Sequence, residues 1–420
     1  MFPPGFYRDK NGELNVQGIK VDTLTAKYGT PLFIYDTGLM KERYEAFLNT
    51  VKKVQGNIHY AVKANDSVNI IKFFGKLGAG ADIVSIGEFH KCVAAGISPK
   101  KIIFSGVGKD KNEIEIALKS NILQFNIESE EELTDIYEIA SKLKLTANIC
   151  LRINPDIAPN THKKISTGEK ETKFGIDNEH IFSIYEKLHK LKFINPVGLG
   201  VHIGSQIFDF NFFHKAYSNL KTIANKLKNS GFKVPTLDLG GGIGIYYDEN
   251  KNPDFETYKK VISDLFLGSE YKLSFEPGRI LIAEAGVLVT KVIRNKKNKD
   301  KNFIIIDAAM NNLIRPTLYD AYHRIEPVKK ISGKKIIADI VGPICETGDF
   351  IALNRKITEV NNNDLLIIRT TGAYSSVMKS NYNARVDAVE ILIYNGKSYQ
   401  LKSIDTIMEI ISKEKLIEFT

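Results

Sequence analysis

The sequence has little cysteine, little arginine and no long apolar run, and each shortage excludes a class of protein. Its three cysteines, Cys92, Cys150 and Cys345, are too few and too scattered for a disulfide framework or a zinc site. No stretch approaches the roughly 18 uninterrupted apolar residues of a membrane-spanning helix. The first residues also lack the apolar core of a signal peptide. We therefore expect a soluble, cytoplasmic protein without a membrane partner.

The net charge of +9 comes mainly from lysine, because only ten of the 58 basic residues are arginine. The lysines are spread along the chain. The one dense cluster, residues 294–301, lies between two strand-like runs and is typical of a solvated hairpin tip. Nucleic-acid-binding proteins concentrate positive charge and usually interleave aromatic residues with it. We therefore expect the charge to promote solubility, with no nucleic-acid partner.

Residues 57 to 278 alternate short apolar runs with longer segments of helical periodicity. The strand candidates are residues 57–64, 81–85, 102–106, 123–129, 147–154, 197–204, 236–242 and 272–278. Eight strand–helix repeats in about 220 residues favour an α/β fold built as a (β/α)8 barrel of the TIM type. An open doubly wound sheet stays as the alternative, although the chain has no GxGxxG fingerprint of a dinucleotide site.

After Arg279 the pattern changes to strand-like runs separated by polar turns, which predicts a second, mostly antiparallel β domain. These runs cover residues 287–294, 303–308, 335–342, 349–355, 364–370 and 390–396, and residues 13–21 could add another strand. We place the barrel at residues 26–278 and the β-rich domain at residues 1–25 together with 279–420. A polar insertion at residues 155–173 follows the fifth strand, and a loop of this length predicts a lid.

The C-terminal ends of the strands carry the chemistry in barrels of this kind. Here those ends offer Lys63, Asp82, Ser85, Ser105, Asn126, Arg152, His202, Ser205, Gly240 to Gly242, Glu276 and Arg279. A lysine at the position of Lys63 usually extends to solvent. The functional interpretation is a Schiff-base lysine, whose neutral amine attacks an aldehyde. Gly240 to Gly242 form either a simple tight turn or a phosphate cradle of backbone N–H groups.

The other strand ends have two interpretations each. Glu276 and Arg279 form either a surface ion pair or a site in which a buried glutamate binds a cationic heteroaromatic nitrogen, which keeps a pyridine ring an electron sink. His202 is either structural or stacks on a planar cofactor, with Ser205 donating to a phosphate. Cys345 lies in a turn-rich loop at residues 342–349 and is expected to be exposed, whereas the other two cysteines suit the core.

Taken together and in order, these motifs resemble the fold-type III pyridoxal-phosphate-dependent decarboxylases, and among them the branch that acts on diaminopimelate. The resemblance covers roughly residues 6 to 415. Its motifs are YAVKAN at 60–65, ADIVSIGE at 81–88, TH at 161–162 with ISTG at 165–168, KFG at 173–175, HIGSQ at 202–206, GGG at 240–242, EPGR at 276–279, RPTLY at 315–319, GPICE at 342–346 and GAYS at 372–375. The implied fold is the alanine-racemase-like arrangement of a barrel and a β-rich domain.

The resemblance also implies a role for each residue. Lys63 carries pyridoxal 5'-phosphate as the internal aldimine, Glu276 keeps the pyridine nitrogen protonated, and Cys345 protonates the carbanion. The other cofactor-binding residues are His202, Ser205, Gly240, Gly241, Gly242, Pro277, Gly278, Arg279 and Tyr374, with no metal. The substrate-binding residues are Arg279, Arg315, Tyr319, Glu346 and Tyr374. Cys345 and Glu346 come from a partner subunit, which implies a homodimer with shared active sites.

The implied reaction is decarboxylation of meso-2,6-diaminopimelate to L-lysine and CO2, the last step of lysine biosynthesis. Arg315 and Tyr319 suit a second carboxylate, whereas an ornithine or arginine decarboxylase needs an acidic residue for a bare cationic tail. That polyamine-type decarboxylase, a non-catalytic cofactor-binding homologue and a racemase remain as alternatives. Glu276 disfavours the racemase, and the presence of Lys63 and Cys345 disfavours the non-catalytic homologue.

Overall fold

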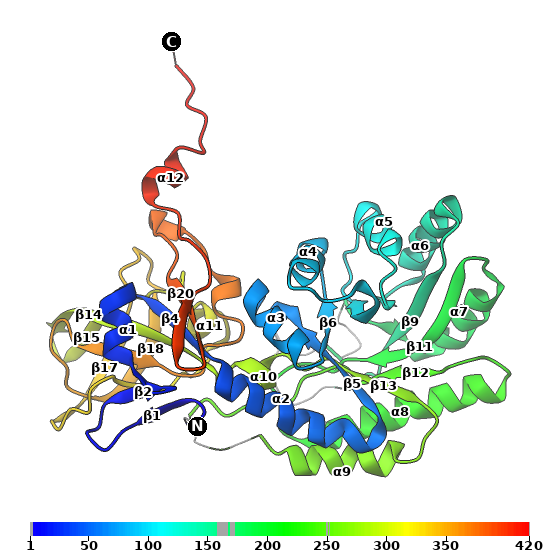
Figure 1. Cartoon of the computed structure of the whole chain (residues 1–420), viewed down its shortest axis with the longest axis horizontal. Helices are drawn as coiled ribbons and strands as arrows, with labels where there is room; N and C mark the ends of the chain where they lie inside the picture. The colour runs from blue at the N-terminus through cyan, green and yellow to red at the C-terminus, as the bar shows by residue number, and fades with distance from the viewer. Residues whose placement is uncertain (1–2, 158–166, 169–172, 249–250, 252, 420) are drawn as a thin grey trace. The chain divides into compact units, whose positions relative to one another are not determined.

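The structure is a computed structural model that describes residues 3–157, 167–168, 173–248, 251 and 253–419 (Figure 1). The chain divides into two compact units. One comprises Arg43–Tyr246 and Lys251–Ile280, and the other comprises Met1–Glu42, Tyr247–Asn250 and Leu281–Thr420. No helix among the described residues is long and apolar enough to cross a membrane.

The first unit is a closed barrel of eight parallel strands. The strands are β5 (Gly56–Ala61), β6 (Gly80–Ile83), β7 (Ile102–Phe104), β8 (Gln124–Ile127), β9 (Ala147–Asn154), β11 (Ile194–Val201), β12 (Thr236–Asp238) and β13 (Lys272–Phe275), and the two-residue β10 (Ile176–Asp177) pairs with the end of β9. Each strand pairs with the next, and the pairing of β13 with β5 closes the circle. The predicted (β/α)8 barrel is therefore confirmed, and the open sheet is wrong.

Helices connect the strands and cover the barrel (Figure 1). They are α2 (Thr37–Val51), α3 (Val68–Lys76), α4 (Ile86–Ala94), α5 (Lys111–Lys119), α6 (Glu130–Leu143), α7 (Asn178–Lys190), α8 (Phe210–Asn229), α9 (Phe255–Phe266) and the short α10 (Arg279–Ile282), with 3-10 turns at η1 (Lys52–Val54), η2 (Val62–Ala64) and η3 (Pro99–Lys101). Ser85, Asp110 and Ser129 each accept a backbone N–H at a helix start. Such caps fix where a helix begins, because its first N–H groups have no partner inside the helix.

The second unit is built on a mostly antiparallel sheet, which confirms the predicted β-rich domain. Its strands are β4 (Leu32–Asp36), β14 (Gly286–Asn298), β15 (Lys301–Ile306), β16 (Ile325–Pro327), β17 (Lys335–Val341), β18 (Phe350–Thr358), β19 (Leu365–Ile368), β20 (Val389–Tyr394) and β21 (Lys397–Gln400). A separate three-stranded sheet holds β1 (Phe6–Arg8), β2 (Leu14–Val16) and β3 (Ile19–Lys20). The helices of this unit are α1 (Val21–Tyr28), α11 (Arg315–Tyr319) and α12 (Ile407–Ile411), with 3-10 turns at η5 (Ser376–Met378) and η6 (Tyr382–Ala384).

Of two notable segments in this unit, the sequence pattern misses one and predicts the other. The strand β4 pairs with both β14 and β20, although it lies more than 200 residues before them in the chain. The basic cluster at 294–301 is an antiparallel hairpin in which β14 and β15 pair through Asn298 and Lys301. Its residues are mostly exposed, so the predicted solvated hairpin tip is confirmed.

Candidate active site

The C-terminal end of the barrel carries buried polar side chains where a packed core would be apolar. Asp82 lies one residue before the end of β6, Asn126 lies in β8, Asp238 ends β12, and Glu276 follows β13 directly. All four are less than one-tenth exposed. Side chains in a barrel strand point alternately inward and outward. A single inward polar residue near the end of each of several strands therefore makes this end of the barrel interior polar.

Lys63 lies in the 3-10 turn η2, because β5 ends at Ala61, earlier than the apolar run predicts. Its Nζ lies 2.8 Å from Oδ2 of Asp82. The Asp82 side chain is fully buried, and its other oxygen, Oδ1, has no hydrogen-bond partner among the described residues. The Lys63 side chain is one-third exposed, so its amine is anchored by a buried carboxylate and still accessible from outside the barrel.

Glu276 is buried at the end of the barrel. Its Oε1 accepts a hydrogen bond from Nδ2 of Asn126 at 3.2 Å and lies 3.5 Å from Oγ of Ser105. Burial, followed by the charges of Asp238 and Asp82, raises the pKa of Glu276 well above its ordinary value. Glu276 is 6% exposed and Arg279 7% exposed, so the two do not form a surface ion pair.

The glycine loop 240–242 follows β12 rather than ending it, because the strand stops at Asp238. Gly240 and Gly242 have φ values of 64° and 110°, which favour glycine. A Cβ on Gly241 would lie 2.3 Å from the carbonyl oxygen of Glu276, so the two loops approach too closely for any side chain. The glycines therefore satisfy the tight-turn interpretation. Gly240 and Gly241 are buried and their N–H groups donate to Asp238 and His202, so the half-buried Gly242 is the one of the three whose N–H can meet a phosphate.

His202 follows β11 and contacts this loop. Its Nδ1 lies 3.2 Å from the backbone nitrogen of Gly241, which donates the hydrogen bond, so the proton of the neutral ring lies on Nε2. Burial, followed by the positive charges of Arg152 and Lys63, lowers the pKa of His202 well below its ordinary value. The imidazole is therefore an uncharged flat surface at neutral pH.

Arg279 begins α10 and is held by Ser205. Its Nε and Nη2 donate to the same hydroxyl oxygen, at 3.3 Å and 3.0 Å. Because Ser205 Oγ accepts two hydrogen bonds, its own O–H remains available to donate. Pro277 and Gly278 place this loop against β5: the Pro277 carbonyl accepts the backbone N–H of Ala61 at 3.2 Å, and a Cβ on Gly278 would lie 3.0 Å from that of Ala64.

The remaining predicted residues lie in the β-rich unit. Arg315, in α11, is 5% exposed; its Nη1 lies 2.8 Å from Nε2 of His323, and its guanidinium carbon lies 4.5 Å from the ring centroid of Tyr247. Tyr319, at the end of the same helix, is half-buried. Tyr374 has a φ of 55°, a backbone conformation that non-glycine residues rarely adopt and that clusters at functional sites.

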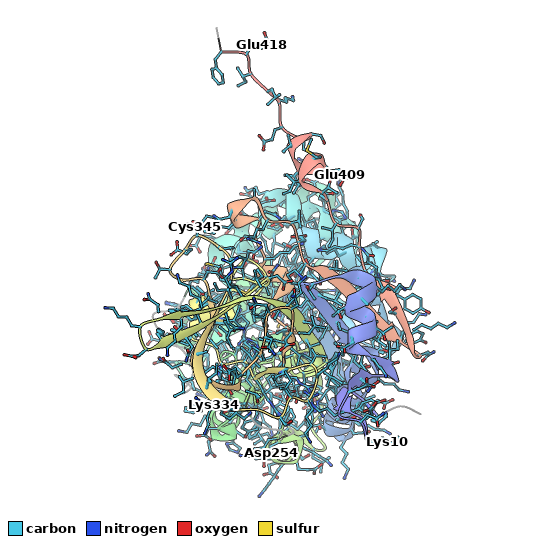
Figure 2. All side chains as sticks on the ribbon, turned by 90° about the vertical axis from the view of Figure 1, so that its left-hand side faces the viewer. Lys10, Asp254, Lys334, Cys345, Glu409 and Glu418 are labelled. Atoms are coloured by element: carbon cyan, nitrogen blue, oxygen red, sulfur yellow. The ribbon has the colours of Figure 1, made fainter. Side chains whose placement is uncertain are left out.

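Cys345 and Glu346 occupy an exposed loop of this unit, and Figure 2 shows Cys345 at its surface. The loop is nevertheless held in place. Asp349 accepts the backbone N–H groups of Met310 and Ile344, each at 2.7 Å, and Asn383 Oδ1 accepts that of Cys345 at 2.8 Å. The predicted residues thus form two groups, one in each compact unit.

Comparison with known proteins gives the family. The family model for the pyridoxal-dependent decarboxylase, pyridoxal binding domain, matches residues 37–283. The chain is 44% identical to the diaminopimelate decarboxylase of Aquifex aeolicus, with 93% of this chain and 92% of the relative aligned. It is also 44% identical to that of Zymomonas mobilis, with 98% of each aligned. This chain belongs to the diaminopimelate decarboxylase family of pyridoxal-dependent enzymes.

Solved structures of this family have the same fold. The crystal structure of diaminopimelate decarboxylase from M. jannaschii in complex with L-lysine superposes with a TM-score of 0.93 at 34% identity, covering 98% of each chain. The Helicobacter pylori diaminopimelate decarboxylase complexed with L-lysine gives 0.89 at 36% identity, covering 93% of this chain and 98% of that chain. Because these matches span nearly the whole chain, both compact units are part of the family fold.

The family uses pyridoxal 5'-phosphate, and the barrel end fits that cofactor. Glu276 is a buried carboxyl with no cationic partner among the described residues, and a protonated pyridine nitrogen would supply one. Lys63 offers an accessible amine, and the neutral ring of His202 offers a flat surface. The donor set therefore matches the aldehyde, the ring nitrogen and the ring face of the cofactor.

Several residues of this site were not singled out for a role from the sequence. Asp82 and Asn126 stand at predicted strand ends, where no role could be assigned, and Asp238 lies inside an apparently ordinary strand, TLDL. The available signal was a carboxylate or amide at an inward position of an otherwise apolar strand.

Most of the predicted lid, residues 158–166 and 169–172 with its Thr161 and Ile165 motifs, lies outside the described residues.

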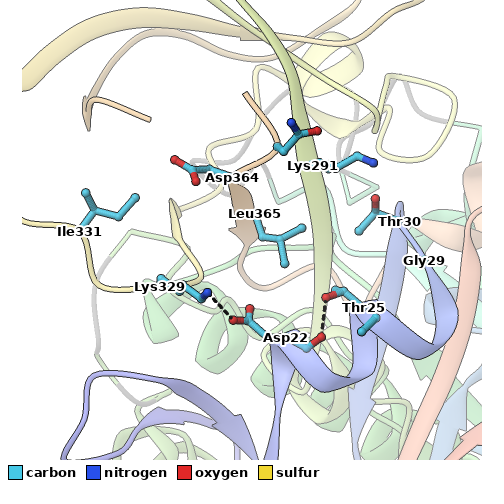
Figure 3. Close-up of a pocket in the computed structure, with 11 residues that line it drawn as sticks. Asp22, Thr25, Gly29, Thr30, Lys291, Lys329, Ile331, Asp364 and Leu365 are labelled. Carbon is cyan, nitrogen blue, oxygen red and sulfur yellow. Dashed lines mark hydrogen bonds and ion pairs between the residues drawn. The ribbon is translucent and has the colours of Figure 1, made fainter. Parts of the chain in front are cut away.

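A cavity of about 560 Å³ lies elsewhere, in the β-rich unit (Figure 3). It lies beside α1, where Lys329 forms an ion pair with Asp22 at 3.5 Å, and Ile331 and Leu365 add apolar lining. None of the residues predicted from the sequence lines it. It is therefore distinct from the candidate active site.

Proposed function

We propose that this chain decarboxylates meso-2,6-diaminopimelate to L-lysine and CO2, the last step of lysine biosynthesis. The observation that carries the proposal is the buried, uncompensated carboxyl of Glu276 in a chain 44% identical to curated diaminopimelate decarboxylases over nearly its full length. Pyridoxal phosphate, when bound, supplies an electron sink for the carbanion left by loss of CO2. Its ring accepts those electrons well only when its nitrogen is protonated, and Glu276 is placed to hold that proton.

The barrel residues bind and orient the cofactor. Lys63 provides the amine that attaches the aldehyde, and Asp82 fixes the position of that amine through the 2.8 Å contact. The neutral ring of His202 covers the pyridine face without bringing a positive charge close to the ring nitrogen. Ser205, with its O–H oriented away from Arg279, donates to the phosphate. The backbone N–H of Gly242 joins it, because those of Gly240 and Gly241 already donate within the protein. We assign Pro277, Gly278 and Tyr374 to the same cofactor site.

The substrate's second carboxylate distinguishes diaminopimelate from ornithine. Arg315 is held in one orientation by His323 and by the ring of Tyr247, which leaves less conformational entropy to lose on binding. A fixed guanidinium suits a carboxylate through two parallel hydrogen bonds. We assign the distal carboxylate to Arg315 and Tyr319. Arg279, which also contacts Ser205, binds a substrate carboxylate, and Glu346 binds the amino end of the substrate.

We also propose a homodimer in which the loop of Cys345 and Glu346 completes the site of a second copy. This loop is exposed, yet Asp349 and Asn383 hold its backbone in place. Cys345 would donate the proton that replaces CO2, from a thiol positioned before the substrate arrives. Because all three cysteines are unpaired, we place the enzyme in the reducing cytoplasm.

The cofactor assignment is tested by absorbance and CO2 release. Lys63→Ala is expected to lose the visible absorbance of the bound cofactor and the release of CO2 from meso-diaminopimelate. Lys91→Ala is the matched control, because Lys91 is also on the barrel and also pairs with an aspartate, Asp66. Retention of absorbance and turnover by Lys63→Ala would remove Lys63 from the proposal.

Shared active sites are tested by mixing two inactive variants. In a dimer of Lys63→Ala with Cys345→Ala, one of the two sites has both residues intact. Random reassociation is therefore expected to restore about a quarter of the wild-type rate, since half of the dimers are mixed and each has one working site. No recovery in a sample shown to contain mixed dimers would contradict shared sites.

A further inference from the structure

Asp238 and Glu276 are neighbours on the inner face of the barrel. In the parallel pairing of β12 with β13, Asp238 lies opposite Ser274. Glu276 is two residues further along, so it shares a face with Ser274. The backbone N–H of Glu276 donates to the carbonyl of Gly240 at 2.8 Å, which keeps the two strand ends together. The exposed fractions are 3% for Asp238 and 6% for Glu276.

A single amide nitrogen holds both carboxyl groups. Nδ2 of Asn126 lies within donating distance of Oδ2 of Asp238 at 3.1 Å and of Oε1 of Glu276 at 3.2 Å. Its two hydrogens are shared between these acceptors and Oγ of Ser105, at 3.1 Å. The orientation of this amide is fixed, because Nε2 of Gln124 donates to its Oδ1 at 2.8 Å. Since each carboxyl oxygen contacts the same nitrogen atom, the two acids are within about two hydrogen-bond lengths of each other.

The charges around the pair do not compensate two anions. Asp82 adds a third buried carboxylate, and Lys63, whose charge lowers the pKa of Glu276 in part, is itself paired with Asp82. The charge of the pair also acts on the buried Cys150 and Tyr217, and both are neutral near pH 7 because burial raises the pKa of each. Two carboxylates that share a buried site do not both ionise, so one of them keeps a proton.

The hydrogen bonds show which acid keeps it. Asp238 accepts two hydrogen bonds at about 3 Å, from the backbone N–H of Gly240 and from Asn126, and such bonds favour the ionised form. Glu276 accepts one from Asn126, while Ser105 lies at the 3.5 Å limit. Burial raises the pKa of both acids, so the difference in hydrogen bonding decides between them.

We infer that Asp238 and Glu276 form a proton-sharing pair, in which the Asp238 carboxylate holds a proton on Glu276 until a pyridine nitrogen takes it. The proton leaves the Glu276 carboxyl oxygen for the lone pair of the ring nitrogen. Glu276 becomes a carboxylate, the ring becomes cationic, and the charge of Asp238 does not change. Asp238 is thus a positioning residue that acts through Glu276. The inference rests on the proposed function, since the cofactor supplies that nitrogen.

The pair can be tested in the cofactor-free protein by infrared spectroscopy. The carbonyl stretch of a protonated carboxyl is followed from about pH 5 to about pH 9, and Glu276→Gln identifies which part of the signal belongs to Glu276. Subtracting the spectrum of Glu276→Gln from that of the wild type also removes the contribution of Glu88, because burial raises the pKa of Glu88 to about 7 and this signal is present in both proteins. In Asp238→Asn the midpoint of the Glu276 signal is expected to fall by about one pH unit or more, a tenfold change in proton concentration.

Two further variants keep the test decisive. Asn126→Ser removes the shared donor while both acids remain, so the midpoint is expected to rise, the opposite direction. This variant carries the test if Asp238→Asn does not fold. Asp339→Asn is the matched control, because Asp339 is also buried but pairs with Lys301 in the β-rich unit. An unchanged midpoint in Asp238→Asn, or in Asn126→Ser where the first does not fold, would overturn the inference.

A second measurement separates this inference from the proposed function. With ¹⁵N-labelled pyridoxal phosphate bound, the nitrogen chemical shift reports whether the ring is protonated, without turnover. Asp238→Asn is expected to lower the pH at which the ring nitrogen loses its proton. If the cofactor binds and CO2 is released but this pH is the same in both proteins, only the inference fails. If the cofactor does not bind, the proposed function fails, and the infrared titration still decides the pair.

Discussion

Replacing Glu276 with glutamine is expected to stabilise the cofactor-free protein and to remove most of the CO2 release of the cofactor-bound enzyme. Burial, followed by the charge of Asp238, raises the pKa of Glu276 well above the ordinary 4.5. The folded chain therefore keeps a proton that the unfolded chain releases above that pH. The contribution of Glu276 to the free energy of unfolding is fully present below pH 4.5. It decreases by about 1.4 kcal/mol per pH unit as the pH rises toward the pKa of Glu276 in the folded protein.

Glutamine has nearly the same size as glutamate and no titrating proton, so the variant avoids this loss. Urea unfolding of both cofactor-free proteins at about pH 5, 6 and 7 measures the difference. The advantage of Glu276→Gln over wild type is expected to grow with pH, by at most roughly 1.4 kcal/mol per unit. Free energies of unfolding that differ by the same amount at all three pH values would show that Glu276 does not keep its proton in the folded protein.

Glu326 provides a matched control with the opposite shift. Burial opposes ionisation there, but the charge of Arg369, which lies 2.6 Å away, prevails and lowers the pKa of Glu326. Glu326 is therefore ionised in both the folded and the unfolded chain between about pH 5 and 7. Glu326→Gln is expected to destabilise the protein by a pH-independent amount of about 1–2 kcal/mol, because it removes the charged partner of a half-buried guanidinium.

Three further variants test single contacts. Cys345→Ala is expected to keep the cofactor absorbance and lower turnover by about 10²-fold or more, whereas Cys92→Ala should keep its turnover; equal turnover in both would remove Cys345 as the acid. Arg315→Lys is expected to raise KM for meso-diaminopimelate by about tenfold, since a lysine cannot form the paired hydrogen bonds; an unchanged KM would exclude Arg315 from the substrate site. Gly241→Ala places a Cβ 2.3 Å from the carbonyl oxygen of Glu276, so cofactor binding measured by fluorescence titration should weaken, and unaltered affinity would show that the loop can adapt.

The barrel could be predicted because its strands are separate apolar runs with helical segments between them. Periodicity alone places Lys63 and Glu276 at the C-terminal ends of their strands, where parallel strands meet. The strand before Lys63 nevertheless ends at Ala61, because a 3-10 turn continues the apolar run without continuing the sheet. An apolar pattern does not distinguish these two conformations over three residues.

The contacts within the site could not be predicted, since they depend on strand register and on residues far apart in the chain. Asp238 and Glu276 are brought together only by the pairing of β12 with β13. Arg279 and Ser205 are 74 residues apart. The environment of Arg315 likewise includes Tyr247, from a different part of the sequence. Motif order identifies which residues matter, whereas the folded strands decide which of them touch.

The proposed substrate, diaminopimelate, differs from ornithine in carrying a second carboxylate. The most direct measurement is the ratio of kcat/KM for meso-diaminopimelate to that for L-ornithine, with CO2 and the amine product quantified together. We expect one lysine per CO2 from diaminopimelate and a ratio of at least about 10³, because ornithine leaves the buried Arg315 without its carboxylate. Turnover of ornithine without turnover of diaminopimelate would contradict both the proposed reaction and the assignment of Arg315.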